Sequence, residues 1–436
     1  MQHRTLCLAA AVSILHATMV LGQNWPQWRG PEGTGVSAQR GLPLQWSETS
    51  GLVWKCDLPA WGHSTPVIWG DALFLTTHVD DSQLCLLKLD KKSGKILWNQ
   101  TVGNDSAPKP TTGKRTDEDR NRQVFHKTQN LASPSPVTDG EVVIAHFGNG
   151  DLAAYDFQGQ RLWKRNLQQE FGKYSIWWGH ANSPILYQDL VISVCMQDAC
   201  TDLQPKPNPS YLVAHDKRTG QQRWFTLRTT QAAAEDADSY TTPLLWRNGS
   251  HMEMLVMGGQ ILDSYDPATG KRLWQLPGLG GSRVITGIAL GEGMAVVTQG
   301  KRAPMLAVKL GGQGTLTPDA ILWQDDTATP DSPTPVISAG LVFSVADNGI
   351  AKCLDAKTGK VQWEERLKGQ YRASPLAAEG RIYFLNMQGL ATVIRAAATF
   401  ERLAENQLDD SSFASPVVSD ARIFLRGKER LYCIGH

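Results

Sequence analysis

The sequence predicts an all-β fold, an eight-bladed β-propeller of four-stranded antiparallel blades, on three observations. A hairpin unit with Asp near its start, Gly at its turn and Trp at its end recurs along the chain, as in segments 89–98 and 354–363. A Pro that follows Ser or Thr recurs before an apolar segment. The 436 residues include 40 Gly and 15 Trp, which is typical of a β-rich protein with many turns.

The hairpin unit follows from turn chemistry. Its Asp side chain hydrogen-bonds the turn backbone, and its Gly adopts positive φ without steric cost. Related units occur at 155–163, 215–224 and 265–274. Tryptophan recurs at one equivalent place in seven units, so we interpret the series as packing between neighbouring blades and not as a ligand platform. The series is Trp54, Trp98, Trp163, Trp224, Trp274, Trp323 and Trp363.

The proline marks the start of the first strand in each unit, where a missing N–H is tolerated. A turn residue and a second strand follow, so each unit contains four strands. Seven units start at Pro66, Pro136, Pro184, Pro243, Pro335, Pro375 and Pro416. The degenerate segment 284–287 supplies the fifth of eight starts. If this unit is not a complete blade, the alternative is a seven-bladed ring.

The two ends of the ring are predicted to share the last blade. The unit that begins at Pro416 ends after three strands at Cys433, whereas segment 52–55 precedes the first proline start. We therefore expect segment 52–55 to form the outermost strand of the last blade. This closure removes two exposed sheet edges.

Residues 1–22 have the features of a signal peptide, because Arg4 precedes an apolar run that ends near Gly22. Cleavage there leaves residues 23–436 as one predicted propeller domain, exported to the periplasm or the cell exterior. No later segment approaches the roughly 18 consecutive apolar residues of a membrane span. The largest insertion, 103–130, is polar and charged, so it is predicted to be a solvated surface loop, with a lid over one face as the alternative.

The amino-acid composition argues against one class of binding partner. The chain has 43 basic and 42 acidic residues and a net charge of +1, which argues against a nucleic-acid partner. A monomer is expected. For the close pair Cys195 and Cys200, a disulfide and two free thiols both remain open. Motifs of serine hydrolases, zinc proteases and P-loop proteins are absent from the sequence, so these activities have no local support.

A binding site is predicted at the axial mouth of the ring, from residues that precede the innermost strands. His63 and His180 occur in matching Trp-Gly-His contexts, and Arg372 is expected opposite them. A purely structural alternative is that each histidine bonds a neighbouring carbonyl at a blade junction. With Arg283 and Arg372 as charged donors, the mouth would bind an anionic or sugar-like molecule.

The predicted ligand-binding or partner-binding residues are His63, His126, His180, Asn182, Tyr240, Arg283, Asp331 and Arg372. His126 belongs to the end of the long insertion and could fold over the mouth. No catalytic residue and no metal ligand is assigned.

The Asp-x-x-(Ser/Thr)-Gly-Lys-x-x-Trp hairpins and the (Ser/Thr)-Pro strand starts resemble the pyrroloquinoline quinone (PQQ)-like eight-bladed propeller repeat, from Trp46 to the C-terminus. Segment 24–31 resembles the opening of secreted bacterial members of that family. The resemblance implies one of two functions. BamB-like propellers bind no cofactor and scaffold outer-membrane protein assembly, whereas quinoprotein dehydrogenases hold PQQ and calcium on the propeller axis.

The alcohol-oxidising dehydrogenases carry two adjacent cysteines, and this sequence has neither that pair nor a Cys-x-x-Cys-His haem motif. The candidate calcium ligands Asp331, Asp347, Asn348 and Asp355 lie near hairpins or strand starts, where turn roles explain them. We therefore favour a binding or assembly scaffold that uses its loop face for a protein partner or a small polar ligand, without cofactor or metal. The alternative is a PQQ-dependent alcohol or sugar dehydrogenase with a divergent site and calcium.

Overall fold

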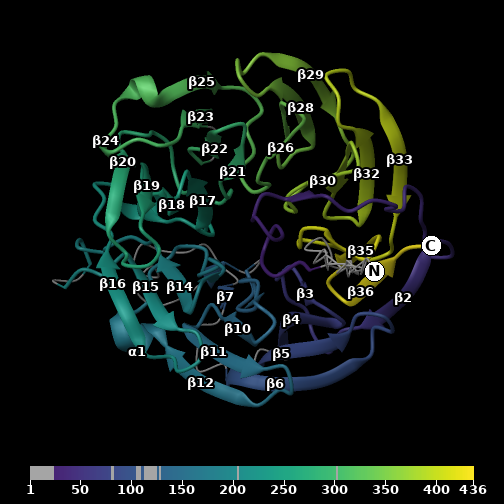
Figure 1. The fold of residues 1–436 in the computed structure, drawn as a ribbon, viewed down its shortest axis with the longest axis horizontal. Helices are drawn as coiled ribbons and strands as arrows, with labels where there is room; N and C mark the ends of the chain where they lie inside the picture. The colour runs from purple at the N-terminus through teal and green to yellow at the C-terminus, as the bar shows by residue number, and fades with distance from the viewer. Residues whose placement is uncertain are drawn as a thin grey trace, which may run out of the picture.

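Eight four-stranded sheets are arranged radially around one axis in the computed structural model (Figure 1). The structure describes residues 24–79, 83–104, 110–111, 125–126, 129–203, 206–300 and 303–436. The predicted signal peptide 1–22 and most of the insertion 103–130 lie outside this range. Within it, helix is confined to α1 (Leu167–Phe171) and the short 3₁₀ segments η2 (Ala234–Ala237) and η3 (Pro318–Ala320). None of these helices could cross a membrane.

Each blade runs from an inner strand near the axis to an outer strand at the rim (Figure 1). Blade 1 consists of β3 (Val67–Trp69), β4 (Ala72–Val79), β5 (Gln83–Asp90) and β6 (Ile96–Asn104). Blade 2 consists of β9 (Val137–Thr138), β10 (Val142–His146), β11 (Asp151–Asp156) and β12 (Arg161–Asn166). Blade 3 consists of β13 (Ile185–Tyr187), β14 (Leu190–Cys195), β15 (Tyr211–Asp216) and β16 (Gln222–Leu227). Blade 4 consists of β17 (Leu244–Asn248), β18 (His251–Gly258), β19 (Ile261–Tyr265) and β20 (Arg272–Leu276).

The second half of the ring repeats this order. Blade 5 consists of β21 (Ala289–Gly291), β22 (Met294–Thr298), β23 (Met305–Lys309) and β25 (Ile321–Asp325). Blade 6 consists of β26 (Val336–Ser338), β27 (Leu341–Val345), β28 (Ile350–Asp355) and β29 (Val361–Arg366). Blade 7 consists of β30 (Leu376–Ala378), β31 (Arg381–Leu385), β32 (Leu390–Arg395) and β33 (Arg402–Gln407). Blade 8 consists of β34 (Val417–Ser419), β35 (Arg422–Arg426), β36 (Arg430–Ile434) and β2 (Leu52–Asp57).

Both predictions about the ring are confirmed. The fifth unit is a complete four-stranded blade, so the ring has eight blades and not seven. The N-terminal strand β2 pairs antiparallel with β36, with Leu52 opposite Ile434 and Lys55 opposite Tyr432. This pairing joins the two ends of the ring within one sheet.

Three short strand pairings add to the blades. β1 (Val36–Ser37) pairs parallel with β30 at the axis, and β24 (Gly314–Thr315) pairs parallel with β20 at the rim. β7 (Pro110–Thr111) pairs parallel with β8 (Phe125–His126) inside the long insertion.

The apolar core lies between the faces of neighbouring blades. For example, Phe74 and Leu86 of blade 1 share one buried cluster with Val143 and Tyr155 of blade 2. The inner strands therefore bury side chains on both faces, as in β10 and β14, which explains why many inner segments are continuous apolar runs in the sequence.

The tryptophans join the outer strand of one blade to the next blade, as the sequence predicts. Six of them donate their indole N–H to a backbone carbonyl of the following blade, at 2.8–3.2 Å between nitrogen and oxygen. In five of these six junctions the turn glycine of the following blade lies against the indole, and a Cβ added to Gly359 would be 2.7 Å from Trp323 Cδ2. The glycine is therefore required both by its φ of +70° and by this close approach. The donor–acceptor pairs are Trp54–Lys91, Trp98–Phe157, Trp163–Lys217, Trp224–Pro267, Trp323–Ala356 and Trp363–Ala397.

Two junctions differ: blade 7 has Leu403 in place of the tryptophan, and the junction between blades 4 and 5 has a tryptophan with another partner. Blade 5 lacks the Asp-Gly hairpin, and its last two strands are joined through β24 and η3. Trp274 instead donates its indole N–H to Glu253 of its own blade, at 2.8 Å. The parallel pairing of β24 with β20 supplies a different link across this junction.

The segment before β2 crosses the centre of the ring, as its purple trace in Figure 1 shows. Trp25 exchanges two backbone hydrogen bonds of 2.8 Å with Ile68 of blade 1. On the other side, the buried guanidinium of Arg29 donates to the carbonyls of Thr334 (2.9 Å) and Pro335 (2.7 Å) at the start of blade 6. Burial lowers the pKa of Arg29 to about 9, which leaves it charged at neutral pH.

The blade junction can be tested with two glycines that have nearly equal φ. Gly359→Ala places a methyl group against Trp323, whereas Gly340 (φ +72°) has no atom within 4 Å of an added Cβ. Gly340→Ala should cost about 1 kcal/mol of backbone strain, and Gly359→Ala should cost about 1–3 kcal/mol more because of overpacking. Urea unfolding of both variants measures this difference. Equal losses would show that the indole contact contributes nothing beyond the backbone conformation.

Candidate functional site

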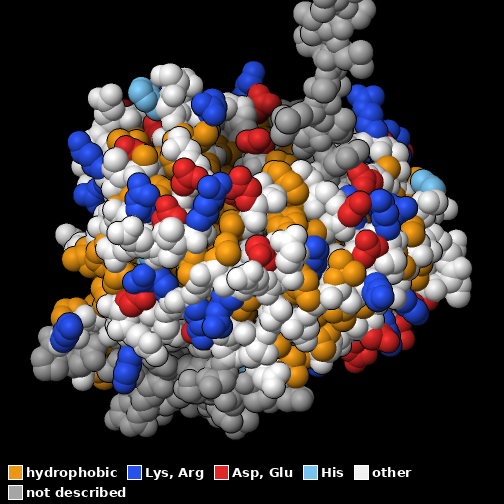
Figure 2. All heavy atoms as spheres, turned by 60° about the horizontal axis from the view of Figure 1, so that its bottom comes forward, with side chains coloured by type: hydrophobic (Ala, Val, Ile, Leu, Met, Phe, Trp, Pro, Cys, Tyr) orange, Lys and Arg blue, Asp and Glu red, His pale blue; other side chains and the backbone are white. Residues whose placement is uncertain are grey.

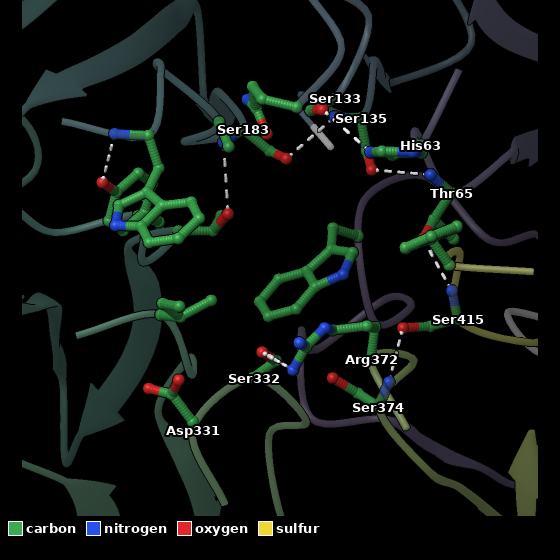
Figure 3. A pocket seen from close by; sticks show the side chains of 18 of the residues that line it. His63, Thr65, Ser133, Ser135, Ser183, Asp331, Ser332, Arg372, Ser374 and Ser415 are labelled. Carbon is green, nitrogen blue, oxygen red and sulfur yellow. Dashed lines mark hydrogen bonds between the residues drawn. The ribbon is translucent and has the colours of Figure 1, made fainter. Parts of the chain in front are cut away.

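A cavity of about 370 Å³ lies on the propeller axis (Figure 3). Its wall consists mainly of residues that precede the inner strands, and Trp28 of the N-terminal segment is one of its lining residues. Figure 3 shows Asp331, Ser332 and Arg372 on one side of this axial cavity and His63 and Ser133 on the other. The lining residues are Trp28, His63, Thr65, Gln129, Ser133, Ser135, Trp178, Ala181, Ser183, Tyr240, Thr242, Arg283, Ile285, Asp331, Ser332, Arg372, Ser374, Phe413 and Ser415.

The Ser or Thr before each strand-start proline belongs to a hydrogen-bonded ring around the axis, part of which is drawn in Figure 3. The backbone N–H of this residue donates to the hydroxyl of its counterpart in the next blade. The bonds are 2.9 Å for Thr65 to Ser135 and 3.3 Å for Ser415 to Thr65, where blade 8 meets blade 1. We call the seven residues Thr65, Ser135, Ser183, Thr242, Thr334, Ser374 and Ser415 the hydroxyl ring.

The hydroxyl ring is interrupted only at blade 5, where Gly287 has no hydroxyl. A Cβ added to Gly287 would lie 2.7 Å from Trp28 Cη2. Gly287 still donates its own N–H to the hydroxyl of Thr334, at 2.6 Å. The indole of Trp28 occupies the space that a side chain at position 287 would need. This is a physical reason why the fifth unit has glycine there and lacks the (Ser/Thr)-Pro marker.

One side of the axial cavity carries paired charges. Arg283 forms ion pairs with Glu235 (3.0 Å) and Asp331 (3.3 Å), and its guanidinium lies 5.1 Å from the ring centroid of Trp178. Its side chain is only 10% exposed, so these contacts hold it in one position.

Arg372 is held by a second set of contacts. It forms an ion pair with Asp347 and donates to the hydroxyl of Ser332 at 3.0 Å. Asp347 also accepts the backbone N–H groups of Asp331 (2.8 Å) and Ser332 (3.0 Å), so it shapes the whole turn. The side chain of Arg372 remains 44% exposed, which leaves its guanidinium accessible to a ligand.

On the opposite side, the lining residues His63, Ser133 and Phe413 carry no charge. His63 is stacked on Phe413 with 4.5 Å between ring centroids, and its Nδ1 lies 3.4 Å from the hydroxyl of Ser133. Burial, together with the positive charges of Arg426 and Lys428, lowers the pKa of His63 to about 3. At neutral pH it is an uncharged imidazole, and its buried Nε2 has no hydrogen-bond partner among the described residues.

The structure brings together five of the eight predicted site residues. His63, Tyr240, Arg283, Asp331 and Arg372 all line the axial cavity. Tyr240 accepts the backbone N–H of Trp178 at 3.0 Å, and burial together with nearby Asp238 raises its pKa well above the usual value.

Two others, His180 and Asn182, do not line the cavity. His180 is buried, with its Nε2 3.3 Å from Nδ1 of His146 and its ring stacked on Tyr174. Asn182 is also buried and donates to the carbonyls of Ser239 (3.1 Å) and Thr241 (2.8 Å). Similar Trp-Gly-His contexts therefore do not give His63 and His180 equivalent positions. The side chain of His126, in β8, lies outside the described residues.

The cavity also contains residues outside the predicted set, among them Trp28, Gln129 and Trp178. Trp28 comes from the opening segment, which was noted only for its resemblance to other chains. Gln129 comes from the end of the insertion and donates to the carbonyl of His180 at 3.1 Å. Trp178 was considered only as a neighbour of His180. The Trp-Arg pair at 28–29 in an otherwise turn-rich segment was the available signal for a buried anchor.

The acidic groups near the axial cavity do not fit a calcium ion. Asp331 and Glu235 are paired with Arg283, and the oxygens of Asp347 accept from Arg372 and two backbone N–H groups. Calcium requires six to eight converging oxygens, and across the described part of the chain no group of three or more His, Cys, Asp or Glu could hold a metal. The six described cysteines, including Cys195 and Cys200, are free thiols.

Comparison with known proteins places this fold in a family. A family model described as outer membrane protein assembly factor BamB matches residues 31–208 and 315–399, which together are more than half of the chain. The chain belongs to this BamB family. Among curated proteins, no sequence matches this BamB-family chain.

Solved structures show the same fold at low sequence identity. BamB from Moraxella catarrhalis is 12% identical with a TM-score of 0.59, and the match covers 88% of this chain and 99% of that one. A europium-containing methanol dehydrogenase is 11% identical with a TM-score of 0.67, covering 95% and 98%. Quinohemoprotein alcohol dehydrogenase from Comamonas testosteroni is 13% identical with a TM-score of 0.67, covering 96% and 81%. At these identities the likeness concerns the fold alone.

Buried histidines give the BamB-family chain a testable pH dependence. Burial lowers the pKa of His180 to about 3, from an ordinary value of 6.5. The unfolded chain therefore binds a proton that the folded chain excludes, so stability is lost as pH falls from about 6.5 toward 3. His180→Gln should reduce proton uptake on unfolding by about one proton. Urea unfolding at several pH values measures the slope. An unchanged slope in His180→Gln would show that this imidazole is already protonated in the fold.

Proposed function

We propose that this BamB-family chain is an exported binding protein whose loop face presents the axial cavity to a small polar ligand. The single observation that carries the proposal is the convergence of fixed polar groups from many blades on one cavity of about 370 Å³. This size and this mixture of aromatic and polar lining are typical of small-molecule sites.

The contacts described above make the cavity a preorganised site. Arg283 and Asp331 hold each other, Arg372 is oriented by Asp347, and the hydroxyls are fixed by neighbouring blades. Because these groups are already ordered, a ligand loses little free energy in arranging them. Trp28 and Phe413 supply aromatic surface beside the polar groups.

Binding without catalysis agrees best with the chemistry of the wall. Its only lining carboxylate, within the described residues, is Asp331, which is paired with Arg283. His63 is neutral and packed against Phe413. We infer that neither is placed as an acid–base pair, so the proposal includes no reaction and no quinone cofactor.

Export and the absence of a nucleic-acid partner belong to the same proposal. The signal-peptide features of residues 1–22 support export. Basic and acidic side chains are interspersed over the face seen in Figure 2, in agreement with the net charge of +1. A surface of this kind has no extended positive field for a polyanion.

Thermal unfolding with a panel of small polar compounds tests the proposal. A compound that binds only the folded mature protein raises Tm in a saturable way. Arg372→Ala should weaken this binding about tenfold or more through loss of a charged donor, while Arg366→Ala, an exposed control, should leave it unchanged. A rise in Tm that requires PQQ and calcium, together with dye-linked alcohol or sugar oxidation, would instead support a dehydrogenase. Failure of every compound to raise Tm would contradict a small-ligand site.

A further inference from the structure

The hydroxyl ring has O–H groups whose protons are not donated in the hydrogen bonds between blades. Six of its seven members line the axial cavity, namely Thr65, Ser135, Ser183, Thr242, Ser374 and Ser415. Each of these side chains is at least nine-tenths buried, with relative exposures from 2% to 8%. The site is therefore built into the fold and does not depend on mobile surface groups.

Each of the six hydroxyl oxygens already accepts a backbone N–H from the preceding blade, at 2.9–3.3 Å. A hydroxyl has one proton to donate in addition to its acceptor lone pairs. Within the described residues, no group accepts a hydrogen bond from any of these six hydroxyls. Six O–H donors around one cavity thus have no acceptor among the described residues and are available to a ligand.

We propose that the axial cavity binds a small oxyanion, a molecule bearing a carboxylate, phosphate or sulfate group, whose oxygens accept hydrogen bonds from the hydroxyl ring. This inference rests on the proposed function and names the ligand class. An ionised oxygen is the strongest acceptor available to a hydroxyl donor. Ordered water alone would be the outcome if the cavity had no ligand.

The buried positive charge of Arg29 agrees with an anionic ligand. The guanidinium carbon of Arg29 lies 5.7 Å from the indole centroid of Trp28, which lines the cavity. Its hydrogen bonds go to the carbonyls of Thr34, Thr334 and Pro335, and no carboxylate of the described chain pairs with it. Its positive charge is therefore not cancelled by an acidic neighbour. In a low-dielectric interior such a charge favours an anion nearby.

Thr242 and Thr334 form a matched pair for the test. Both hydroxyls accept one backbone N–H of the hydroxyl ring, from Ser183 at 3.2 Å and from Gly287 at 2.6 Å. Thr242 lines the axial cavity, whereas Thr334 does not. Thr→Val at either position removes one inter-blade hydrogen bond and keeps the side-chain shape, but only Thr242→Val removes a donor from the cavity.

Isothermal titration of the mature protein at constant ionic strength should use sodium phosphate, sodium sulfate and sodium glucuronate, with glucose as the neutral counterpart of glucuronate. We expect saturable binding of at least one oxyanion, weakened about tenfold by Thr242→Val through loss of a charged hydrogen bond. Thr334→Val should leave the affinity within about twofold, and Thr242→Ser, which keeps the hydroxyl, should also retain it. The phosphate, sulfate and glucuronate titrations show which kind of oxyanion is preferred.

Two kinds of failure are distinguishable. If glucose binds as tightly as glucuronate, or if Thr242→Val and Thr334→Val weaken binding equally, the oxyanion inference is overturned while a small-ligand site remains. The oxyanion inference is also overturned, and a small-ligand site remains, if only a neutral compound binds and Arg372→Ala weakens the binding of that compound. If nothing binds, both the inference and the proposed function are wrong.

Discussion

The hydrogen bond from one blade's backbone N–H to the next blade's hydroxyl, just before the inner strand, is the constraint on which the rest of the structure depends. The proline at each strand start cannot donate, so the residue before it provides the last N–H on the axis side. That N–H is buried and must find an acceptor. The hydroxyl of the next blade supplies it, which explains why Ser or Thr precedes all seven strand-start prolines.

The same interaction connects the fold to the candidate site. Since each hydroxyl oxygen is used as an acceptor between blades, its proton is left for the cavity. The spacing of the blades thus fixes the spacing of the donors. At the rim, the indole contacts of the tryptophans hold the blades at equivalent positions. Between blades 4 and 5 both the axial hydrogen bond and the indole contact are changed. Gly287 has no hydroxyl, Trp274 bonds Glu253 of its own blade, and β24 pairs with β20 instead.

Much of the fold could be predicted from the sequence because its determinants are local and repeated. The Asp-Gly hairpins, the strand-start prolines and the position of segment 52–55 gave the strands, the blade number and the ring closure. Position along the repeat also identified His63, Tyr240, Arg283, Asp331 and Arg372 as residues of the axial cavity.

What could not be predicted depends on long-range packing. His180 has the same local context as His63, but it turns toward His146 and Tyr174 between blades, and no local pattern encodes that choice. Trp28 reaches the axis only because Trp25 and Arg29 are anchored to blades 1 and 6. The capacity of the hydroxyl ring becomes visible only when all eight blades are placed around one axis.

A high-resolution crystal structure of the mature protein, grown with glucuronate or phosphate, is the most direct measurement of whether this axial cavity is a ligand site. The account predicts one ordered molecule in the cavity, with an oxygen within hydrogen-bond distance of the Thr242 hydroxyl. Ordered water alone in the cavity, with the added compound bound elsewhere on the ring, would contradict it.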